Sequence, residues 1–200
     1  MNDDAEALLI SNALKGNEAA FTTLVENYQT PVYHLCYRLL GGNTHDAEDA
    51  AQETFLRAYR GLSRYDPQRS FATWLLSIAA HYCIDRLRRQ RMQLISLETF
   101  TGQILPDPNP SPETVTVSNE HQRRVQEMLA TLSPTDRTAV VLHYWYDYSY
   151  EEIAETLSLT VSAVKSRLHR ARRQLAQVWQ ENKATQPLTV EAQPHESPAF

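Results

Sequence analysis

Residues 149–175 read SYEEIAETLSLTVSAVKSRLHRARRQL, and this stretch decides the fold of the second half of the chain. Ser149, followed three residues later by Glu152, forms a capping box, which predicts a helix over residues 150–157. Residues 158–160 then supply a short turn that ends in a hydroxyl residue able to cap the next helix. Two helices separated by a three-residue turn are typical of a helix-turn-helix.

The helix that follows this turn has two opposite faces. At about 100° per residue, one stripe is apolar and is expected to pack inward: Val161, Val164, Leu168, Ala171 and Leu175. The opposite side carries small residues first and cations further along, which suits base contacts followed by phosphate contacts in a major groove. An ordinary helical bundle can also present a solvated basic face, but the capping box, the turn and the two-faced pattern together favour DNA binding. The candidate DNA-contacting residues are Ser162, Ala163, Lys165, Ser166, Arg167, His169, Arg170 and Arg173.

The composition limits the classes of protein to consider. The chain has 200 residues, of which 42% are hydrophobic and 22% charged, and no apolar run reaches the roughly 20 residues of a membrane span. The first residues, MNDDAEALLI, open acidic rather than basic, so we expect no export and a cytoplasmic location. Only 5 glycines and no phosphate-binding loop disfavour nucleotide enzymes. A net charge of -5 implies that any contact with nucleic acid is local.

The pattern along the chain predicts an all-α protein of two small helical domains on a flexible tether. Helical periodicity covers residues 7–92 and returns over residues 120–181. Between them, residues 93–119 are rich in Pro, Ser, Thr and Asn and hold acids, which predicts a flexible acidic linker. Residues 182–200 are Pro-rich and polar, which predicts a disordered tail.

A helix predicted over residues 44–60 begins with acids and ends with arginine, as the helix dipole favours. Asp46, Asp49 and Glu53 share one face, which could bind a basic partner, although a charge run without context is more often only a solvated face. These acids, with Glu48, could also be imagined as metal ligands for a hydrolase. We disfavour that interpretation because the helix N-terminus already explains them and neither a ligating histidine nor a phosphate loop accompanies them.

The two cysteines, Cys36 and Cys83, cannot build a disulfide framework and have no metal-ligand spacing. They could form a redox switch if the fold brought them together. Cysteines among Leu and Tyr are more often small buried hydrophobic residues, and we favour that interpretation.

Three stretches carry a resemblance to a known family: DAEDAAQETFLRAYRGLSRYDP at 46–67, FATWLLSIAAHYCIDRLRR at 71–89, and LSPTDRTAVVLHYWYDYSYEEIAETLSLTVSAVKSRLHRARRQL at 132–175. In order and spacing they resemble a bacterial RNA polymerase sigma factor of the extracytoplasmic-function group of the sigma-70 family. The first stretch is similar to the part of region 2 that docks on the core polymerase. The resemblance thus implies a core-binding surface of Asp46, Glu48, Asp49, Gln52, Glu53, Phe55 and Arg57.

The second stretch is similar to the part of region 2 that captures the single-stranded minus-ten promoter element. The resemblance implies minus-ten contacts by Tyr65, Asp66, His81, Asp85, Arg88 and Arg89. Clustered cations beside aromatic side chains agree with this, since single strands need both charge and stacking surface. Trp74, however, recurs at helical spacing with Phe71 and is better interpreted as core.

The sequence departs from the family pattern at two positions. His81 stands where an asparagine is common, which leaves the base preference at the minus-ten element open. Ser158 stands where the turn of the helix-turn-helix commonly has glycine, and it requires a tolerated positive φ or a different turn.

The sequence therefore predicts a non-enzymatic sigma factor without cofactor or metal, which binds core RNA polymerase and promoter DNA. The third stretch implies that the recognition helix reads the minus-thirty-five element, and the resemblance makes an anti-sigma factor an expected partner. The main alternative is a helix-turn-helix regulator that acts without being a polymerase subunit. Strong promoter binding by the chain alone would favour that alternative.

Overall fold

The computed structural model describes residues 3–101 and 117–185, and within these ranges the chain is all-helical. The predicted fold class is therefore confirmed. The α-helices are α1 (Asp3–Leu14), α2 (Glu18–Leu39), α3 (Thr44–Gly61), α4 (Phe71–Thr101), α5 (Val117–Ala130), α6 (Pro134–Trp145), α7 (Tyr150–Leu157) and α8 (Val161–Thr185), with a 3-10 turn at Leu62–Arg64. None of the described helices is long and apolar enough to cross a membrane.

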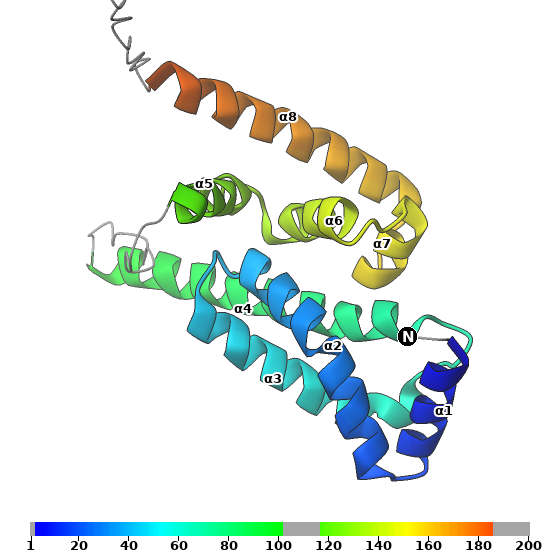
Figure 1. Ribbon diagram of the computed structural model, residues 1–200. Helices are drawn as coiled ribbons and strands as arrows, with labels where there is room; N and C mark the ends of the chain where they lie inside the picture. Colours follow the sequence, from blue (N-terminus) through cyan, green and yellow to red (C-terminus); the bar gives the residue numbers. More distant parts are fainter. Residues whose placement is uncertain (1–2, 102–116, 186–200) are drawn as a thin grey trace, which may run out of the picture.

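Helices α1–α4 form the N-terminal domain, in which α2, α3 and α4 pack along one another (Figure 1). Asparagine side chains start two of these helices: the Asn17 carboxamide accepts from the amide of Ala20, and that of Asn43 from the amide of Asp46. The core between the helices is aliphatic, and its largest fully buried side chains are Leu24, Val32, Leu35, Leu39 and Leu75. The helix predicted over residues 44–60 is present as α3 and packs against this core.

Helices α5–α8 form the C-terminal domain, and the local signals read from the sequence are confirmed there. Ser133 caps α6 with a proline in its first turn, and Ser149 with Glu152 forms the capping box of α7. The Thr160 hydroxyl accepts from the amide of Ala163 at 3.2 Å and so caps α8. Ser158 has φ 54° and ψ 45°, so of the two possibilities left open by the missing glycine the chain adopts the positive φ.

The helices extend into the predicted linker from both sides. Helix α4 continues to Thr101 and α5 begins at Val117, so residues 93–101 and 117–119 are helical rather than extended. The α4 extension, QLISLETFT, contains Leu and Glu, which are good helix formers. Helix α8 continues to Thr185, so residues 182–185 of the predicted disordered tail are helical. The rest of the linker prediction (102–116) and of the tail prediction (186–200) lies outside the described residues.

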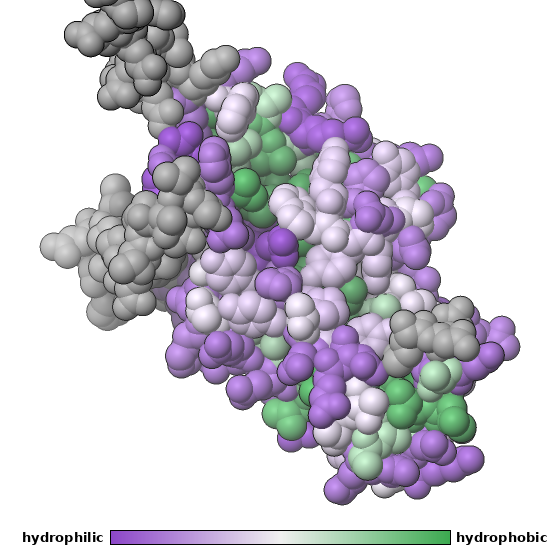
Figure 2. Space-filling view, in the orientation of Figure 1, coloured by the Kyte–Doolittle hydropathy of each residue, from purple (hydrophilic) through white to green (hydrophobic). Residues whose placement is uncertain are grey.

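The two domains are packed together, which the expectation of a flexible tether did not include. Helices α6 and α7 lie against α4 and α2 (Figure 1), and the buried apolar residues of both domains form one continuous cluster. The composition of a linker says how far two domains can separate, but it carries no information about whether their surfaces fit. The face shown in Figure 2 is mostly hydrophilic, with apolar patches that include one over α1. Leu8 and Leu14 of α1 are exposed.

The fold brings the two cysteines together within the N-terminal domain. Cys36 on α2 and Cys83 on α4 are both fully buried and carry free thiols. A hydrogen bond with Cys36, together with burial, raises the pKa of the Cys83 thiol well above its usual value. At neutral pH Cys83 is therefore a protonated thiol rather than a reactive thiolate.

Candidate polymerase and nucleic-acid interfaces

The predicted core-binding residues all lie on α3. The inward side of this helix is small, with Ala47, Ala50 and Ala58 fully buried. Outward, the side chains of Glu48, Asp49 and Gln52 are exposed, while Phe55 is half-buried against the core. Leu56 and Tyr59 are exposed on the same helix, at 51% and 49%. The outer surface of α3 therefore combines acids with large apolar side chains, a mixture that suits a protein partner.

Most charges of this α3 surface already have partners in the same molecule. Asp46 pairs with Arg86 of α4, and the Asp49 carboxylate lies 3.3 Å from His45. Glu53 accepts from the Arg57 guanidinium at 2.8 Å. That guanidinium also lies over the ring of Tyr82, 4.8 Å from its centroid. The surface is therefore ordered before any partner arrives.

Three groups of this surface could also be considered as metal ligands. One ligand atom each of His45, Asp46 and Asp49 lies within 4.8 Å of the others. Arg86 already neutralises Asp46, and two of the three side chains are exposed at a helix N-terminus. The helix dipole and Arg86 account for these acids without a metal ion.

The predicted minus-ten residues divide into an exposed helix face and a loop. His81, Asp85, Arg88 and Arg89 are exposed on α4. The imidazole Nδ1 of His81 lies 2.8 Å from the carbonyl oxygen of Ser77, which fixes the orientation of the ring. This face therefore presents two guanidinium groups beside an imidazole and a carboxylate.

The loop before α4 holds the other two predicted minus-ten residues. Asp66 is exposed and accepts from the amide of Gln68. Tyr65 is only 8% exposed, its hydroxyl donates to the carbonyl of Arg69, and burial raises its pKa. Its ring packs against Phe71 and Trp74, so Trp74 belongs to the core, as its spacing indicated. In this conformation Tyr65 shapes the loop and does not offer a stacking surface.

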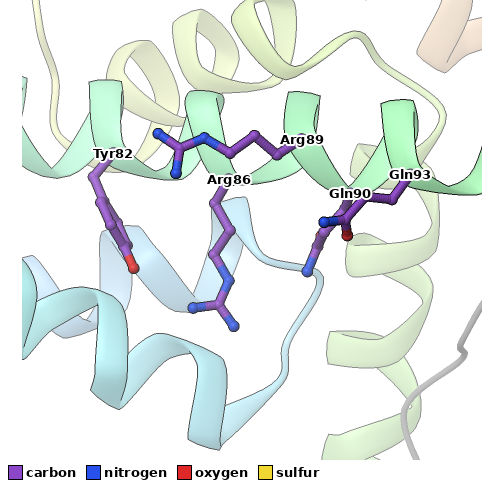
Figure 3. A pocket seen from close by; sticks show the side chains of 5 residues that line it. All are labelled: Tyr82, Arg86, Arg89, Gln90 and Gln93. Carbon is purple, nitrogen blue, oxygen red and sulfur yellow. The ribbon is translucent and has the colours of Figure 1, made fainter.

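A hollow beside the α4 face was not anticipated from the sequence. It has a volume of about 270 Å³ and is lined by Tyr82, Arg86, Arg89, Gln90 and Gln93. Tyr82 and Arg86 point from α4 toward α3, and Arg89 lies along the helix (Figure 3). The spacing of three and four residues in this set was the signal that could have revealed it. All five lining residues belong to α4, and one of them, Arg89, is also a predicted minus-ten residue.

The helix α8 presents the predicted minus-thirty-five residues. Its inner stripe is buried, with Val164, Leu168 and Ala171 each at most 1% exposed. The outer residues Ser162, Lys165, Ser166, His169, Arg170 and Arg173 are exposed, and Ala163 is half-buried. The predicted division of this helix into a packed face and a solvent face is confirmed.

Arg167 differs from the other cations of this helix. Its guanidinium donates to the Asp136 carboxylate of α6 at 2.8 Å, and the two side chains are 30% and 18% exposed. Lys165 lies over the ring of Tyr150, 5.7 Å from the centroid. These contacts tie the recognition helix to α6 and α7, so Arg167 helps to orient the helix within its domain.

Comparisons with known proteins identify the family to which both domains belong. Residues 24–92 match the family model of sigma-70 region 2, and residues 122–175 match that of sigma-70 region 4. The chain is 39% identical over 174 residues to the ECF RNA polymerase sigma factor SigW of Bacillus subtilis, covering 83% of this chain and 92% of SigW.

Two solved structures are similar in fold. One is CnrH in complex with the cytosolic domain of CnrY, with 26% identity, a TM-score of 0.66 and coverage of 89% of this chain and 99% of CnrH. The other is RpoE of Bartonella quintana in complex with the anti-sigma factor NepR, with 19% identity, a TM-score of 0.62 and coverage of 80% and 96%.

The matched segments cover the α3 surface, the α4 face and the helix-turn-helix, in the order that the sequence predicted. Region 4 supplies the DNA-binding helix-turn-helix, and the protein is a transcription factor rather than an enzyme. The chain belongs to the extracytoplasmic-function RNA polymerase sigma factors of the sigma-70 family, which direct transcription initiation.

Proposed function

We propose that three helices of this sigma factor each bind a different part of the transcription complex. Helix α3 docks core RNA polymerase, α4 binds the single-stranded minus-ten element, and α8 reads the minus-thirty-five element. The observation that carries the proposal is the charge of these helices: α3 is acidic, whereas α4 and α8 present exposed arginines. An acidic surface suits a protein partner, and guanidinium groups suit phosphates.

For the minus-thirty-five element, the first turn of α8 is the proposed base-reading part. Ser162 and Ser166 are exposed and short, so the helix can approach the base edges closely. Arg170 and Arg173 follow one turn later and are placed to neutralise phosphates at the groove wall. Arg167 contributes mainly by holding the helix against Asp136.

For the minus-ten element, Arg88 and Arg89 are the proposed phosphate contacts on α4. His81 and Asp85 lie beside them and offer polar groups to an unpaired base. Because Tyr65 is buried, its proposed contribution is to shape the loop that carries Asp66. The adjoining hollow is large enough to admit part of a nucleotide.

We further propose that an anti-sigma factor regulates this chain and that it acts in the cytoplasm, with polymerase and DNA. Support comes from the RpoE structure, which contains an anti-sigma factor, and from the apolar side chains of α3 that remain exposed. Leu56 and Tyr59 offer area that such a protein could cover.

The first test measures binding of the purified chain to core RNA polymerase, with Asp49→Arg and Glu53→Arg combined in one variant. We expect the variant to lose at least about tenfold in affinity, because it places cations on the docking surface. The matched control reverses two exposed acids away from α3, Glu26→Arg with Glu127→Arg, and should bind within about twofold of the native chain.

Circular dichroism must show that both variants keep the native helix content, since Asp49 and Glu53 pair with neighbours on α3. A folded native chain that does not bind polymerase contradicts the proposal. Equal losses for the variant and the control contradict the assignment to α3.

A further inference from the structure

The loop between α3 and α4 is closed by one of its own side chains. This loop carries Asp66, which is exposed and is one of the predicted minus-ten residues. The amide of Arg69 donates to the Asp66 carbonyl at 3.0 Å, and the amide of Gln68 donates to the Asp66 carboxylate at 3.0 Å. The Tyr65 hydroxyl donates to the Arg69 carbonyl and so spans the loop. The position of Tyr65 therefore sets the conformation in which Asp66 is presented.

Aromatic packing fixes the ring of Tyr65 in turn. It lies edge-on to Phe71, the first residue of α4, with the two ring centroids 5.5 Å apart. Phe71 is 2% exposed, and the ring of Tyr28 from α2 also lies edge-on to it, at 5.4 Å between centroids. Edge-on pairs of this kind are favourable beyond the area that they bury. Three rings therefore connect α2, through the start of α4, to the loop.

The Tyr28 side chain is held at its other end by α1. Its hydroxyl donates to the carboxylate of Glu6, and both side chains are half-buried. Burial and this hydrogen bond raise the pKa of Tyr28, so its hydroxyl stays protonated and remains a donor. A carboxylate acceptor makes such a bond roughly twice as strong as a neutral one. The Glu6 carboxylate therefore holds the Tyr28 ring in place against Phe71.

Helix α1 precedes the segment that matches sigma-70 region 2, which begins at residue 24. Figure 1 shows α1 at the same end of the N-terminal domain as the loop. Burial raises the pKa of Tyr65, and the negative charge of Glu6 raises it further, so this charge reaches the loop. A residue from outside the matched segment therefore belongs to the surroundings of the minus-ten loop.

We infer that Glu6 and Tyr28 are positioning residues for this loop, and that α1 thereby contributes to base selection in the single-stranded minus-ten element. The inference rests on the function proposed above, in which the loop and α4 bind that element. A loop held in one conformation binds an unpaired base more tightly, because the competent fraction is larger. Loss of the Glu6 contact leaves the phosphate contacts proposed for Arg88 and Arg89 in place, so base selection should suffer more than nonspecific binding.

The first part of the test measures the loop in the full-length chain by amide hydrogen exchange. Glu6→Ala and Tyr28→Phe each remove the hydrogen bond and should speed exchange at the amides of Gln68 and Arg69 about threefold to tenfold. Glu6→Gln keeps an oxygen acceptor and should restore most of the protection. Unchanged exchange in the loop overturns the inference. An equal acceleration at the amides of α3 shows general destabilisation of the domain and overturns it as well.

The two changes are then combined in one variant. If the hydrogen bond carries the effect, Glu6→Ala with Tyr28→Phe should behave like either single variant, because the second change has no bond left to remove. Effects that multiply assign the two residues to separate roles and overturn the inference. The matched controls are Asp4→Ala, which removes another acid of α1, and Tyr33→Phe, which removes another tyrosine hydroxyl of α2. Both controls should leave exchange in the loop unchanged.

The second part measures base selection by the complex with core RNA polymerase. The probe is a promoter fragment that the native complex selects from random DNA, with its minus-ten segment left single-stranded. It is compared with the same fragment carrying each single-base substitution in that segment. Glu6→Ala and Tyr28→Phe should lower the affinity ratio between the selected and the substituted fragments about threefold, whereas the two controls should keep the ratio. The dependence of affinity on salt should stay the same, because the phosphate contacts are untouched.

The direction of the change separates positioning from repulsion. If Glu6 acts only by repelling phosphates, Glu6→Ala should bind every fragment more tightly with an unchanged ratio, and that result overturns the inference. A loosened loop with an unchanged ratio also overturns it. A native complex without any base preference in the single-stranded segment contradicts the proposed function instead. Because hydrogen exchange is measured on the chain without DNA, the two failures are distinguishable.

Discussion

Helices α3 and α8 both present a charged outer face, but most charges on α3 have a partner nearby and the outermost arginines of α8 have none among the described residues. On α3, Asp46 and Glu53 pair with Arg86 and Arg57, and the Asp49 carboxylate lies beside the imidazole of His45, so most of the acids have a neighbour that orients them. On α8, Arg170 and Arg173 are exposed, and within the described ranges neither lies within salt-bridge distance of an acid. Preorganised ion pairs raise the affinity of a surface for a protein partner, because fewer side chains must be ordered on binding. Unpaired cations raise the affinity of a surface for DNA, because they can neutralise phosphates.

The strongest test of this contrast removes the cations of α8. Arg170→Ala combined with Arg173→Ala should weaken promoter binding by the polymerase complex about 10- to 100-fold and reduce the slope of log affinity against log salt by about 2, since each cation releases about one counterion. The control is Arg123→Ala with Arg124→Ala on α5, where both arginines are paired within the helix. An equal loss in the control would remove the distinction between the two helices.

The pairs of α3 should instead matter for stability. Asp46→Asn leaves the partly buried Arg86 without its carboxylate, and should lower the free energy of unfolding by about 1 kcal/mol in chemical denaturation. Glu48→Gln removes an exposed charge on the same helix and should change it by less than about 0.5 kcal/mol. If both changes have the same effect, the α3 pairs do not preorganise the surface.

Arg167 lies on α8 but is paired with Asp136, so it can be assigned either to the stabilising pairs or to the DNA contacts. Asp136→Asn should cost about 1 kcal/mol of stability and leave promoter affinity within about twofold. Arg167→Ala should weaken promoter binding less than Arg170→Ala does, and should lower stability more. The reverse order in filter-binding and denaturation measurements would place Arg167 among the DNA contacts.

The smallest expected effect concerns the turn that sets the angle of α8. Ser158→Gly should raise the free energy of unfolding by about 0.5–1 kcal/mol, because glycine adopts φ 54° without the steric cost of a Cβ atom. Ser162→Gly, the same replacement inside the first turn of α8, should lower it by a similar amount. A loss of stability in both variants would show that the Ser158 side chain contributes more than its backbone costs.

Local signals in the sequence predicted local structure well. The capping residues Ser149 and Thr160 each marked a helix start that the structure confirms, and the positive φ of Ser158 is one of the two outcomes that the missing glycine left open. These features depend on residues within a few positions of one another. Helical periodicity also divided α8 correctly into an inner and an outer face.

Contacts between distant residues could not be predicted in this way. The burial of Tyr65 was not predicted either, although its contacts with Arg69, Phe71 and Trp74 are near in sequence, because a loop has no periodicity from which an inward side could be read. Arg137 is nearly a hundred residues from Leu39, and no local pattern links a cation in one domain to a helix end in the other. The hollow beside α4 likewise depends on how α3 and α4 pack.

The burial of Cys36 and Cys83 has a consequence for how the folded chain meets oxidants and electrophiles. Peroxides and other electrophiles react with thiolates at the surface, whereas both of these sulfurs are enclosed and Cys83 is held protonated. The folded chain can therefore remain intact while exposed cysteines elsewhere are oxidised.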